Sequence, residues 1–370
     1  MRKLLSWLMV VLIAASLLLA GCANAPDTTG GGQPKTAGKI RVGVSLDTLK
    51  EERWTRDKLH LEEHAKELGV ELIVTVANSD DARQANDVDN LLTQKVDVLI
   101  IIPHNAQTAA AMVEKAKAQG VPVISYDRLI KSDDIDLYVS HQVTRIGEMQ
   151  ADYALKHAPK GNYIMVYGAS TDNNALLLKD AQLKTLKPAL DKGDIKIVAE
   201  QAAKDWRPEE AQKIVENALT QNKNEVVAVV ASNDGTAGGS VEALAAQGLA
   251  GKVLVTGQDA DLAALQRIVE GKQTMTIYKP IKPLAYGALD AAVKLAKKEK
   301  PETNSAVKPV NKEVPARLYD PMVTDKDNMM ETVIKDGYQK FEEVYKNIPP
   351  EKRPKQAMTQ VPSPKSQASG

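Results

Sequence analysis

Short runs of β-branched apolar residues alternate with longer amphipathic stretches along most of this chain. The apolar runs are too short for helices and are bounded by Gly, Pro, Asn or Asp, which is typical of β-strands. We predict strands at residues 40–46, 72–77, 96–102, 121–126, 162–168, 195–199, 226–231, 253–257 and 274–278. We predict helices at residues 56–68, 82–94, 106–119, 144–157, 174–190, 208–220 and 236–247. Because several strands are apolar almost throughout, the pattern indicates parallel sheets that helices cover on both faces.

The alternating pattern falls into two similar halves, residues 40–142 and 162–278. A single large sheet would accommodate all the strands, but a chain of 370 residues fits two domains better. We therefore predict an α/β fold of two doubly wound parallel-sheet domains joined by a three-segment hinge.

The domain boundaries are expected to be discontinuous, because elements that follow the second half often return to the first domain. The expected N-terminal lobe comprises residues 39–143 and 281–311, and the expected C-terminal lobe comprises residues 144–280 and 312–347. The three hinge crossings are expected near residues 141–144, 279–281 and 310–315.

Residues 1–22 have the features of a secretory signal peptide, with two basic residues before an almost wholly apolar run at 4–20. That run is marginal for a membrane span, which needs about 20 apolar residues. It ends in Leu-Ala-Gly-Cys, which resembles the bacterial lipobox, and Cys22 is the only cysteine of the chain. In a lipobox the cysteine is acylated, and two acyl signals anchor a protein stably to a membrane. We therefore predict that Cys22 is lipidated and that the protein is an extracytoplasmic lipoprotein held at the cell membrane. The alternative is a cleaved, secreted protein whose cysteine is coincidental.

Two flanking segments lack apolar periodicity. Residues 23–38 are rich in Gly, Thr and Pro and are predicted to be a flexible tether. Residues 348–370 contain five prolines and are predicted to be a disordered tail. The chain has 48 basic and 48 acidic residues, and this zero net charge argues against nucleic-acid binding. A single cysteine allows neither an intrachain disulfide nor a cysteine-based zinc site.

Polar residues gather after the predicted strands, where open α/β sheets bind ligands. These segments are rich in Asp, Asn and Arg, and they contain Trp54 and Trp206, the only tryptophans after the signal peptide. Sugar hydroxyls are both donors and acceptors, which suits carboxylates, amides and guanidinium groups. Sugar C–H faces pack on aromatic rings. The set therefore favours a neutral polyol over a phosphate, which would call for a Gly-rich turn at a helix N-terminus.

Several of these residues have a structural alternative when each is taken singly. Asp261 and either Asp80 or Asp81 stand where helix N-caps are expected, and Asp234 fits either role. Trp54 lies near the apolar face of its helix, so a core role and a ligand role both stay open. Trp206 precedes a predicted helix and is expected to contact the ligand.

Catalytic patterns are weak in this chain. His60, Glu63 and His64 match the H-x-x-E-H pattern of one zinc-peptidase class, but the charged face around them is typical of a solvated helix. A glycosidase would need a pair of carboxylates, which the strand-end aspartates could supply. The loops that carry them are short, however, so we expect a binding protein that is not an enzyme and uses no catalytic residue, metal or cofactor.

Eight stretches carry a resemblance to a known family. They are Glu52-Arg53-Trp54, VDVLIIIPHN at 96–105, Tyr126-Asp127-Arg128, Asp172-Asn173-Asn174, ASND at 231–234, GQDADL at 257–262, TMTIYKPI at 274–281 and VIKDGY at 333–338. With them, residues 40–338 resemble the periplasmic sugar-binding proteins of the ribose-binding type. The Trp206 loop and TMTIYKPI point more narrowly to the D-xylose-binding proteins of bacterial ABC importers.

The resemblance implies a type I periplasmic binding protein fold and a set of sugar contacts. By matching position, the contacts are Arg53, Asp127, Arg128, Asp172, Asn174, Trp206, Asn233, Asp259 and Lys279. The family has an aromatic side chain where Leu178 stands here, and Trp54 is the candidate for the second stacking face.

The implied function is the capture of a monosaccharide, D-xylose, by hinge closure and its delivery as a monomer to the permease of an ABC importer. A sensor subunit that presents the sugar to a membrane histidine kinase is the alternative. The ligand core of a transcriptional repressor is disfavoured, because a signal peptide rather than a helix-turn-helix precedes Ile40.

Overall fold

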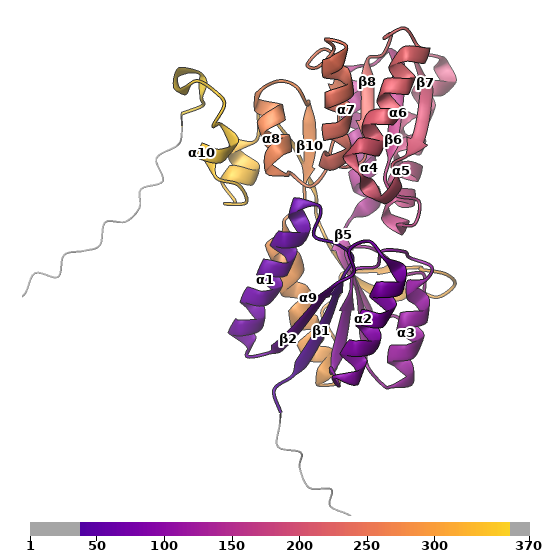
Figure 1. The fold of residues 1–370 in the computed structure, drawn as a ribbon, viewed down its shortest axis with the longest axis vertical. Helices are drawn as coiled ribbons and strands as arrows, with labels where there is room; N and C mark the ends of the chain where they lie inside the picture. Colours follow the sequence, from indigo (N-terminus) through magenta and orange to yellow (C-terminus); the bar gives the residue numbers. More distant parts are fainter. Residues whose placement is uncertain (1–37, 356–370) are drawn as a thin grey trace, which may run out of the picture. The chain divides into compact units, whose positions relative to one another are not determined.

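The computed structural model of this protein describes residues 38–355 (Figure 1). The described residues from Lys39 onward belong to one structural unit. The predicted signal peptide, the predicted lipidation site Cys22 and nearly all of the predicted tether lie outside the described residues. Within residues 38–355, no helix is long and apolar enough to cross a membrane.

The first sheet has seven strands, and its core is built from the apolar runs of the first half. The strands are β1 (Arg41–Leu46), β2 (Glu71–Val76), β3 (Val98–Ile101), β4 (Val123–Tyr126), β5 (Leu137–His141), β11 (Ser305–Val307) and β12 (Val314–Tyr319). Their order is β11-β12-β5-β4-β3-β1-β2, and every neighbouring pair is parallel except β11 with β12. The inner strands β1, β3, β4 and β5 are buried on both faces, which explains their largely apolar sequences.

Helices cover both faces of this first sheet (Figure 1). One face packs against α1 (Glu52–Leu68) and α9 (Ile281–Ala296), through residues such as Leu61 and Leu284. The other face packs against α2 (Asp81–Thr93) and α3 (Ala109–Ala118), through residues such as Leu91 and Met112. Of the two predicted N-cap candidates for α2, Asp80 is the cap, because its side chain accepts a hydrogen bond from the Arg83 amide at 2.7 Å, and Asp81 is the first helical residue.

The second sheet repeats the topology of the first. Its strands are β6 (Gly161–Tyr167), β7 (Ile195–Ala202), β8 (Ala228–Ala231) and β9 (Leu254–Val255). Their order β7-β6-β8-β9 reproduces the order β2-β1-β3-β4, and all pairs are parallel. The sheet is covered by α4 (Val143–His157) and α5 (Asn173–Lys192) on one face and by α6 (Pro208–Gln221) and α7 (Asp234–Ala246) on the other. The predicted α/β fold with two doubly wound parallel sheets is therefore confirmed.

A third group of elements continues from the second sheet. The antiparallel strands β10 (Met275–Tyr278) and β13 (Met322–Asp325) lie beside α8 (Leu262–Val269), the π-helical turn η2 (Met330–Ile334) and α10 (Phe341–Val344). Ile348 packs on this cluster and the turn η3 (Pro350–Lys352) follows it. The predicted disorder from residue 348 is thus wrong for residues 348–355, because Ile348 finds an apolar contact. Residues 356–370 lie outside the described part of the chain.

Two sequence-based expectations about the first sheet need correction. The strand β5 was absent from our predictions, because LYVSH has no long apolar run. The C-terminal lobe was expected to resume at residue 312, yet β12 pairs in parallel with β5 in the first sheet. The third crossing therefore lies after Tyr319 rather than at 310–315, and β12 was misplaced because strand pairing, not composition, decides which sheet a short run joins.

Gly239 on α7 provides a test of the packing between α6 and α7. A Cβ atom at Gly239 would lie 2.0 Å from the backbone oxygen of Pro208, which cannot move aside as a flexible side chain could. We expect Gly239→Ala to lower the free energy of unfolding in urea by about 1–3 kcal/mol. Gly235→Ala on the same helix is the control, since its nearest neighbour would be at 3.6 Å. Equal stability of the two variants would contradict this packing.

Candidate functional site

A polar cavity lies at the carboxyl ends of strands from both sheets, with about 460 Å³ of empty space including its mouth. All ten residues that the sequence predicted for the ligand line it: Arg53, Trp54, Asp127, Arg128, Asp172, Asn174, Trp206, Asn233, Asp259 and Lys279. The first four come from the first half of the chain and the others from the second. Leu178 also lines the cavity, so an aliphatic side chain takes part where the resembling family has an aromatic one.

Arg53 contacts several polar side chains on the side of the cavity formed by the first half of the chain. Its guanidinium donates to Asp127 Oδ2 at 2.7 Å and to both oxygens of Asp57, at 3.1 and 3.2 Å. Tyr126 donates its hydroxyl to the same Asp57 carboxylate. Burial acts to raise the pKa of Asp127, but Arg53 and Lys279 outweigh it and hold that pKa well below its ordinary value. The Asp127 carboxylate is therefore ionised and oriented before any ligand arrives.

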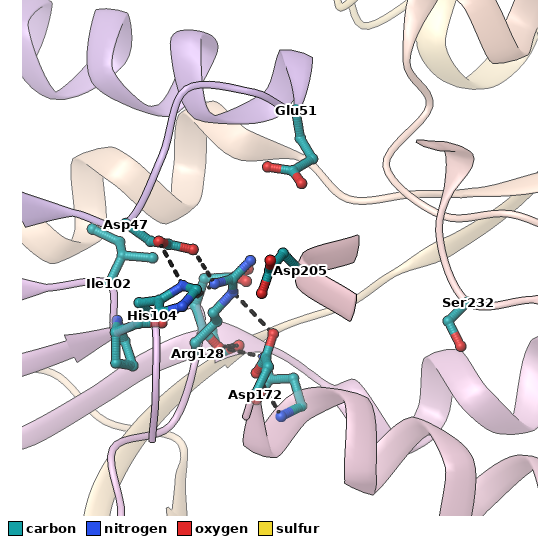
Figure 2. A network of polar contacts seen from close by, with 12 residues as sticks. Asp47, Glu51, Ile102, His104, Arg128, Asp172, Asp205 and Ser232 are labelled. Atoms are coloured by element: carbon teal, nitrogen blue, oxygen red, sulfur yellow. Dashed lines mark hydrogen bonds and ion pairs between the residues drawn. The ribbon is translucent and has the colours of Figure 1, made fainter. Parts of the chain in front are cut away.

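A network of polar contacts meets at Arg128, as Figure 2 shows. Arg128 Nη1 lies 2.6 Å from Asp47 Oδ2, and Arg128 Nε lies 2.9 Å from Asp172 Oδ2. His104 Nδ1 lies 3.0 Å from the other oxygen of Asp47. Because Asp172 follows β6 and Asp47 follows β1, this network joins residues that follow strands of both sheets.

The backbone around Asp127 is also tied to the second sheet. Asp127 has a positive φ of 56°, which a non-glycine residue adopts only when its surroundings hold it there. Its carbonyl oxygen accepts hydrogen bonds from Tyr138, Ser140 and Asn174, each at 2.7 Å. The predicted contact residue Asn174 thus has a structural partner as well as a place in the cavity wall.

The segment after β9 forms the opposite wall. Asp259 Oδ1 lies 2.9 Å from Lys279 Nζ and 3.7 Å from Arg53 Nη1. Asp259 and Ala260 both have positive φ values, 105° and 55°. Tyr338 donates its hydroxyl to the carbonyl oxygen of Asp259 at 3.1 Å. The loop is therefore held in a strained conformation that aims the Asp259 carboxylate into the cavity.

Asp234 is buried and accepts hydrogen bonds from the loop that carries Asp259 and from neighbouring residues. Its carboxylate accepts from Gln273 at 2.9 Å, from Thr276 at 2.8 Å and from the amide of Asp261 at 3.0 Å. Burial raises the pKa of Asp234 to about 7. Of the two roles left open for Asp234, the structure gives it the structural one, since it does not line the cavity.

The two tryptophans are both buried against the cavity. Trp206 has a positive φ of 57°, and a Cβ at Gly168 would lie 2.1 Å from its ring, so Gly168 is what leaves room for the indole. The Trp54 ring lies 4.2 Å from the Arg53 guanidinium carbon and 5.2 Å from that of Arg128, in cation–π arrangements. Trp54 also belongs to the first core cluster, so the core role and the cavity role coincide.

Helix capping and cavity lining also coincide at two positions. The side chains of Asp172 and Asn233 accept hydrogen bonds from the amides of Asn174 and Thr236, at 2.8 and 2.9 Å. The predicted cap at Asp261 is wrong, because its side chain makes no capping hydrogen bond. Glu52 of α1 accepts from the Leu262 amide at 2.7 Å instead. A cap supplied by a residue 210 positions away leaves no local signal in the sequence.

The cavity wall also contains residues that the sequence did not predict. They are Glu51, Ser140, His141, Val143, Ile146 and Gln258. Gln258 stands inside the GQDADL stretch, and its place next to Asp259 was the available signal. His141 donates from Nε2 to the Pro280 carbonyl at 3.2 Å, which leaves Nδ1 as an acceptor. Burial, reinforced by Lys279, lowers the pKa of His141 to about 3, so this ring is neutral.

The H-x-x-E-H helix face lies outside the cavity. His60 and His64 bond to Glu63 and Glu67, at 2.9 and 2.8 Å, as neighbours three residues apart on α1. Among residues 38–355, no group of three His, Cys, Asp or Glu side chains is arranged to hold a metal ion.

The His104–Asp47 contact makes a pH-dependent contribution to stability. The hydrogen bond with Asp47 raises the pKa of His104, although burial opposes it. A raised folded-state pKa contributes stability that is complete below the unfolded value of about 6.5 and is lost as the pH rises through the folded value. We expect urea unfolding to show that wild type loses its advantage over His104→Gln as the pH rises above about 6.5. A constant difference between the two proteins across this range would contradict the assignment.

Comparisons with known proteins agree with this architecture. Residues 42–300 match the family described as the periplasmic binding protein domain. The chain is 47% identical over 306 residues to the D-xylose-binding periplasmic protein of Haemophilus influenzae, covering 83% of this chain and 92% of that protein. It is 45% identical over 308 residues to the D-xylose-binding periplasmic protein of Escherichia coli, covering 83% and 93%.

A solved structure shows the same fold. A carbohydrate transporter solute-binding protein from Chloroflexus aurantiacus, in complex with D-glucose, aligns with a TM-score of 0.78 and 31% identity, covering 83% of this chain and 98% of that one. The predicted type I fold is therefore confirmed. The match from β1 through α9, together with close relatives over most of the chain, shows that this protein belongs to the periplasmic binding protein family.

Proposed function

We propose that this protein is an extracytoplasmic solute-binding protein that captures a monosaccharide, D-xylose, in the cavity and delivers it to the permease of an ABC importer. The observation that carries the proposal is the convergence of ten strand-end residues from both halves of the chain on one polar cavity. The relatives at 45–47% identity are named as D-xylose-binding proteins, which supports the choice of a pentose.

The cavity offers the two kinds of hydrogen-bonding atom that a sugar hydroxyl needs. The indole nitrogens of Trp54 and Trp206 are buried donors that have no partner among the described residues. The Nδ1 atom of His141 is a buried acceptor that has none either. Each hydroxyl both donates and accepts, so a polyol satisfies both kinds of atom at once. An unsatisfied buried polar atom costs about 1–3 kcal/mol, and this penalty favours a ligand of that chemistry.

Sugar binding is proposed to close the two halves around the ligand. Arg53 and Asp127 stand on one side of the cavity and Asp259 and Lys279 on the other. A sugar that touches both sides binds the closed form more tightly than the open one, and this difference in affinity shifts the population toward closure. A permease can then distinguish the loaded protein from the empty one by its surface.

Titration with sugars tests the proposal. We expect D-xylose to change the fluorescence of Trp54 and Trp206 and to raise the melting temperature, because a ligand at 100 times its Kd adds about 2.7 kcal/mol of stability. Pentoses and hexoses should be compared in the same assay. Failure of every monosaccharide to bind would contradict the proposed function.

Replacement of Asp259 tests the role of the cavity in that binding. Asp259→Ala should weaken D-xylose binding by about 2–5 kcal/mol in calorimetry, because it removes a charged partner and leaves the buried Lys279 ammonium only the more distant Asp127, at 3.8 Å. Asp152→Ala is the control, since Asp152 is exposed on α4 and away from the cavity. An affinity for D-xylose equal to that of wild type would exclude Asp259 from the ligand contacts.

We also propose that Cys22 is lipidated and anchors the protein to the outer side of the cell membrane. The support is the Leu-Ala-Gly-Cys sequence at the end of the predicted signal peptide. Cys22→Ala should move the protein from the membrane fraction to the soluble fraction after cell disruption. Retention of the variant in the membrane fraction would overturn the anchor.

The same cavity and anchor would serve a sensor that presents sugar to a membrane histidine kinase. Crosslinking in membranes with D-xylose, followed by identification of the captured partner, separates the two functions. A permease subunit supports the transport role, and a kinase supports the sensor role.

A further inference from the structure

Glu51 is a cavity residue that neither the sequence prediction nor the family resemblance assigned. It stands directly before α1, next to Glu52 and Arg53, and its side chain is only 9% exposed. Both carboxylate oxygens are buried and have no hydrogen-bond partner among the described residues. Figure 2 shows Glu51 near the network in which Asp47 and Asp172 are joined to Arg128.

The nearby groups of the protein do not satisfy this carboxylate. Glu51 occupies the N-cap position of α1, yet its side chain makes no capping hydrogen bond. The Lys50 ammonium lies 3.5 Å from Glu51 Oε1, but it donates to the carbonyl oxygen of Asp205 at 2.5 Å. The positive end of the α1 dipole favours a negative charge at this place without supplying a directed donor.

Glu51 also differs from the other carboxylates that line the cavity, because no cation of the lining pairs with it. The three cations make their shortest contacts within the lining to three different carboxylates: Arg53 to Asp127 at 2.7 Å, Arg128 to Asp172 at 2.9 Å and Lys279 to Asp259 at 2.9 Å. Glu51 is the one lining carboxylate of the described residues that is left over. A group that approaches it must therefore be a hydrogen-bond donor, because a ligand carboxylate or phosphate would meet repulsion.

We propose that Glu51 is a specificity residue of the cavity, which accepts a hydrogen bond directly from one hydroxyl group of the bound sugar. The inference rests on the proposed function, since it takes the ligand to be a neutral monosaccharide. A buried carboxylate with two free oxygens gains most from such a donor, because hydrogen bonds to ionised groups are about twice as strong as neutral ones. Glu51 thereby selects sugars that place a hydroxyl at this wall.

A double-mutant cycle between Glu51 and the sugar hydroxyls tests the proposal. The Kd values of wild type and Glu51→Met are measured by calorimetry for D-xylose and for its monodeoxy analogues at C1, C2, C3 and C4. Methionine keeps the length of the side chain and removes both oxygens. Glu51→Gln, which retains one acceptor oxygen, should give intermediate values.

We expect Glu51→Met to raise the Kd for D-xylose about tenfold. One deoxy analogue should bind wild type about tenfold more weakly than D-xylose, and this loss should disappear in Glu51→Met. Glu62→Met is the matched control, because Glu62 lies on α1 outside the cavity and makes a half-buried pair with Lys58. Melting curves without sugar confirm that each variant is folded.

Two outcomes would overturn the role of Glu51. The first is a Kd for D-xylose in Glu51→Met that equals the wild-type value, and the second is a loss for every deoxy analogue that is the same in both proteins. Wild type serves as the internal reference. If wild type binds no monosaccharide, the proposed function itself fails, whereas wild-type binding without coupling to Glu51 removes only this inference.

Discussion

The structure depends on pairing buried charges across one cavity. Arg53, Arg128 and Lys279 are each almost fully buried, and an isolated buried cation would cost several kcal/mol. Carboxylates from both halves of the chain compensate them, so the ion pairs that make burial tolerable also bring the strand ends together. The same pairing fixes the direction of the carboxylates, and it keeps Asp127 ionised. A sugar thus enters a set of hydrogen-bonding groups that is already organised, which limits the entropy lost on binding.

The duplicated topology explains how such a set can arise at one place. Each half is a doubly wound sheet, and the polar residues that follow its parallel strands lie at one edge. Two such edges face one cavity, so side chains distant in sequence become neighbours. Strained backbone at Asp127, Trp206 and Asp259 then directs individual side chains inward. The helices on the outer faces bury the apolar strands and contribute N-terminal positions such as Asp172 to the wall.

Much of the fold and of the candidate site was predictable, because each rests on local patterns. Strand and helix periodicity located β1 to β4, β6 to β10 and α1 to α7. The residues after the strands marked the polar loops, and the family resemblance selected the ten cavity residues among them. The failures have long-range causes. The sheet that β12 joins is decided by pairing with β5, and the cap of α8 comes from Glu52 on α1. The sequence did not identify Glu51 as a cavity residue, because it stands just before the stretch Glu52-Arg53-Trp54 that matches the family. Only the structure shows that its carboxylate is buried without a hydrogen-bond donor.

A crystal structure of the protein grown with D-xylose tests the central claim most directly. The account predicts density for one intact sugar in the cavity, with hydrogen bonds from Arg53 or Asp127 on one side and from Asp259 or Asn233 on the other. Density for the sugar elsewhere, or contacts from residues of one half alone, would contradict it.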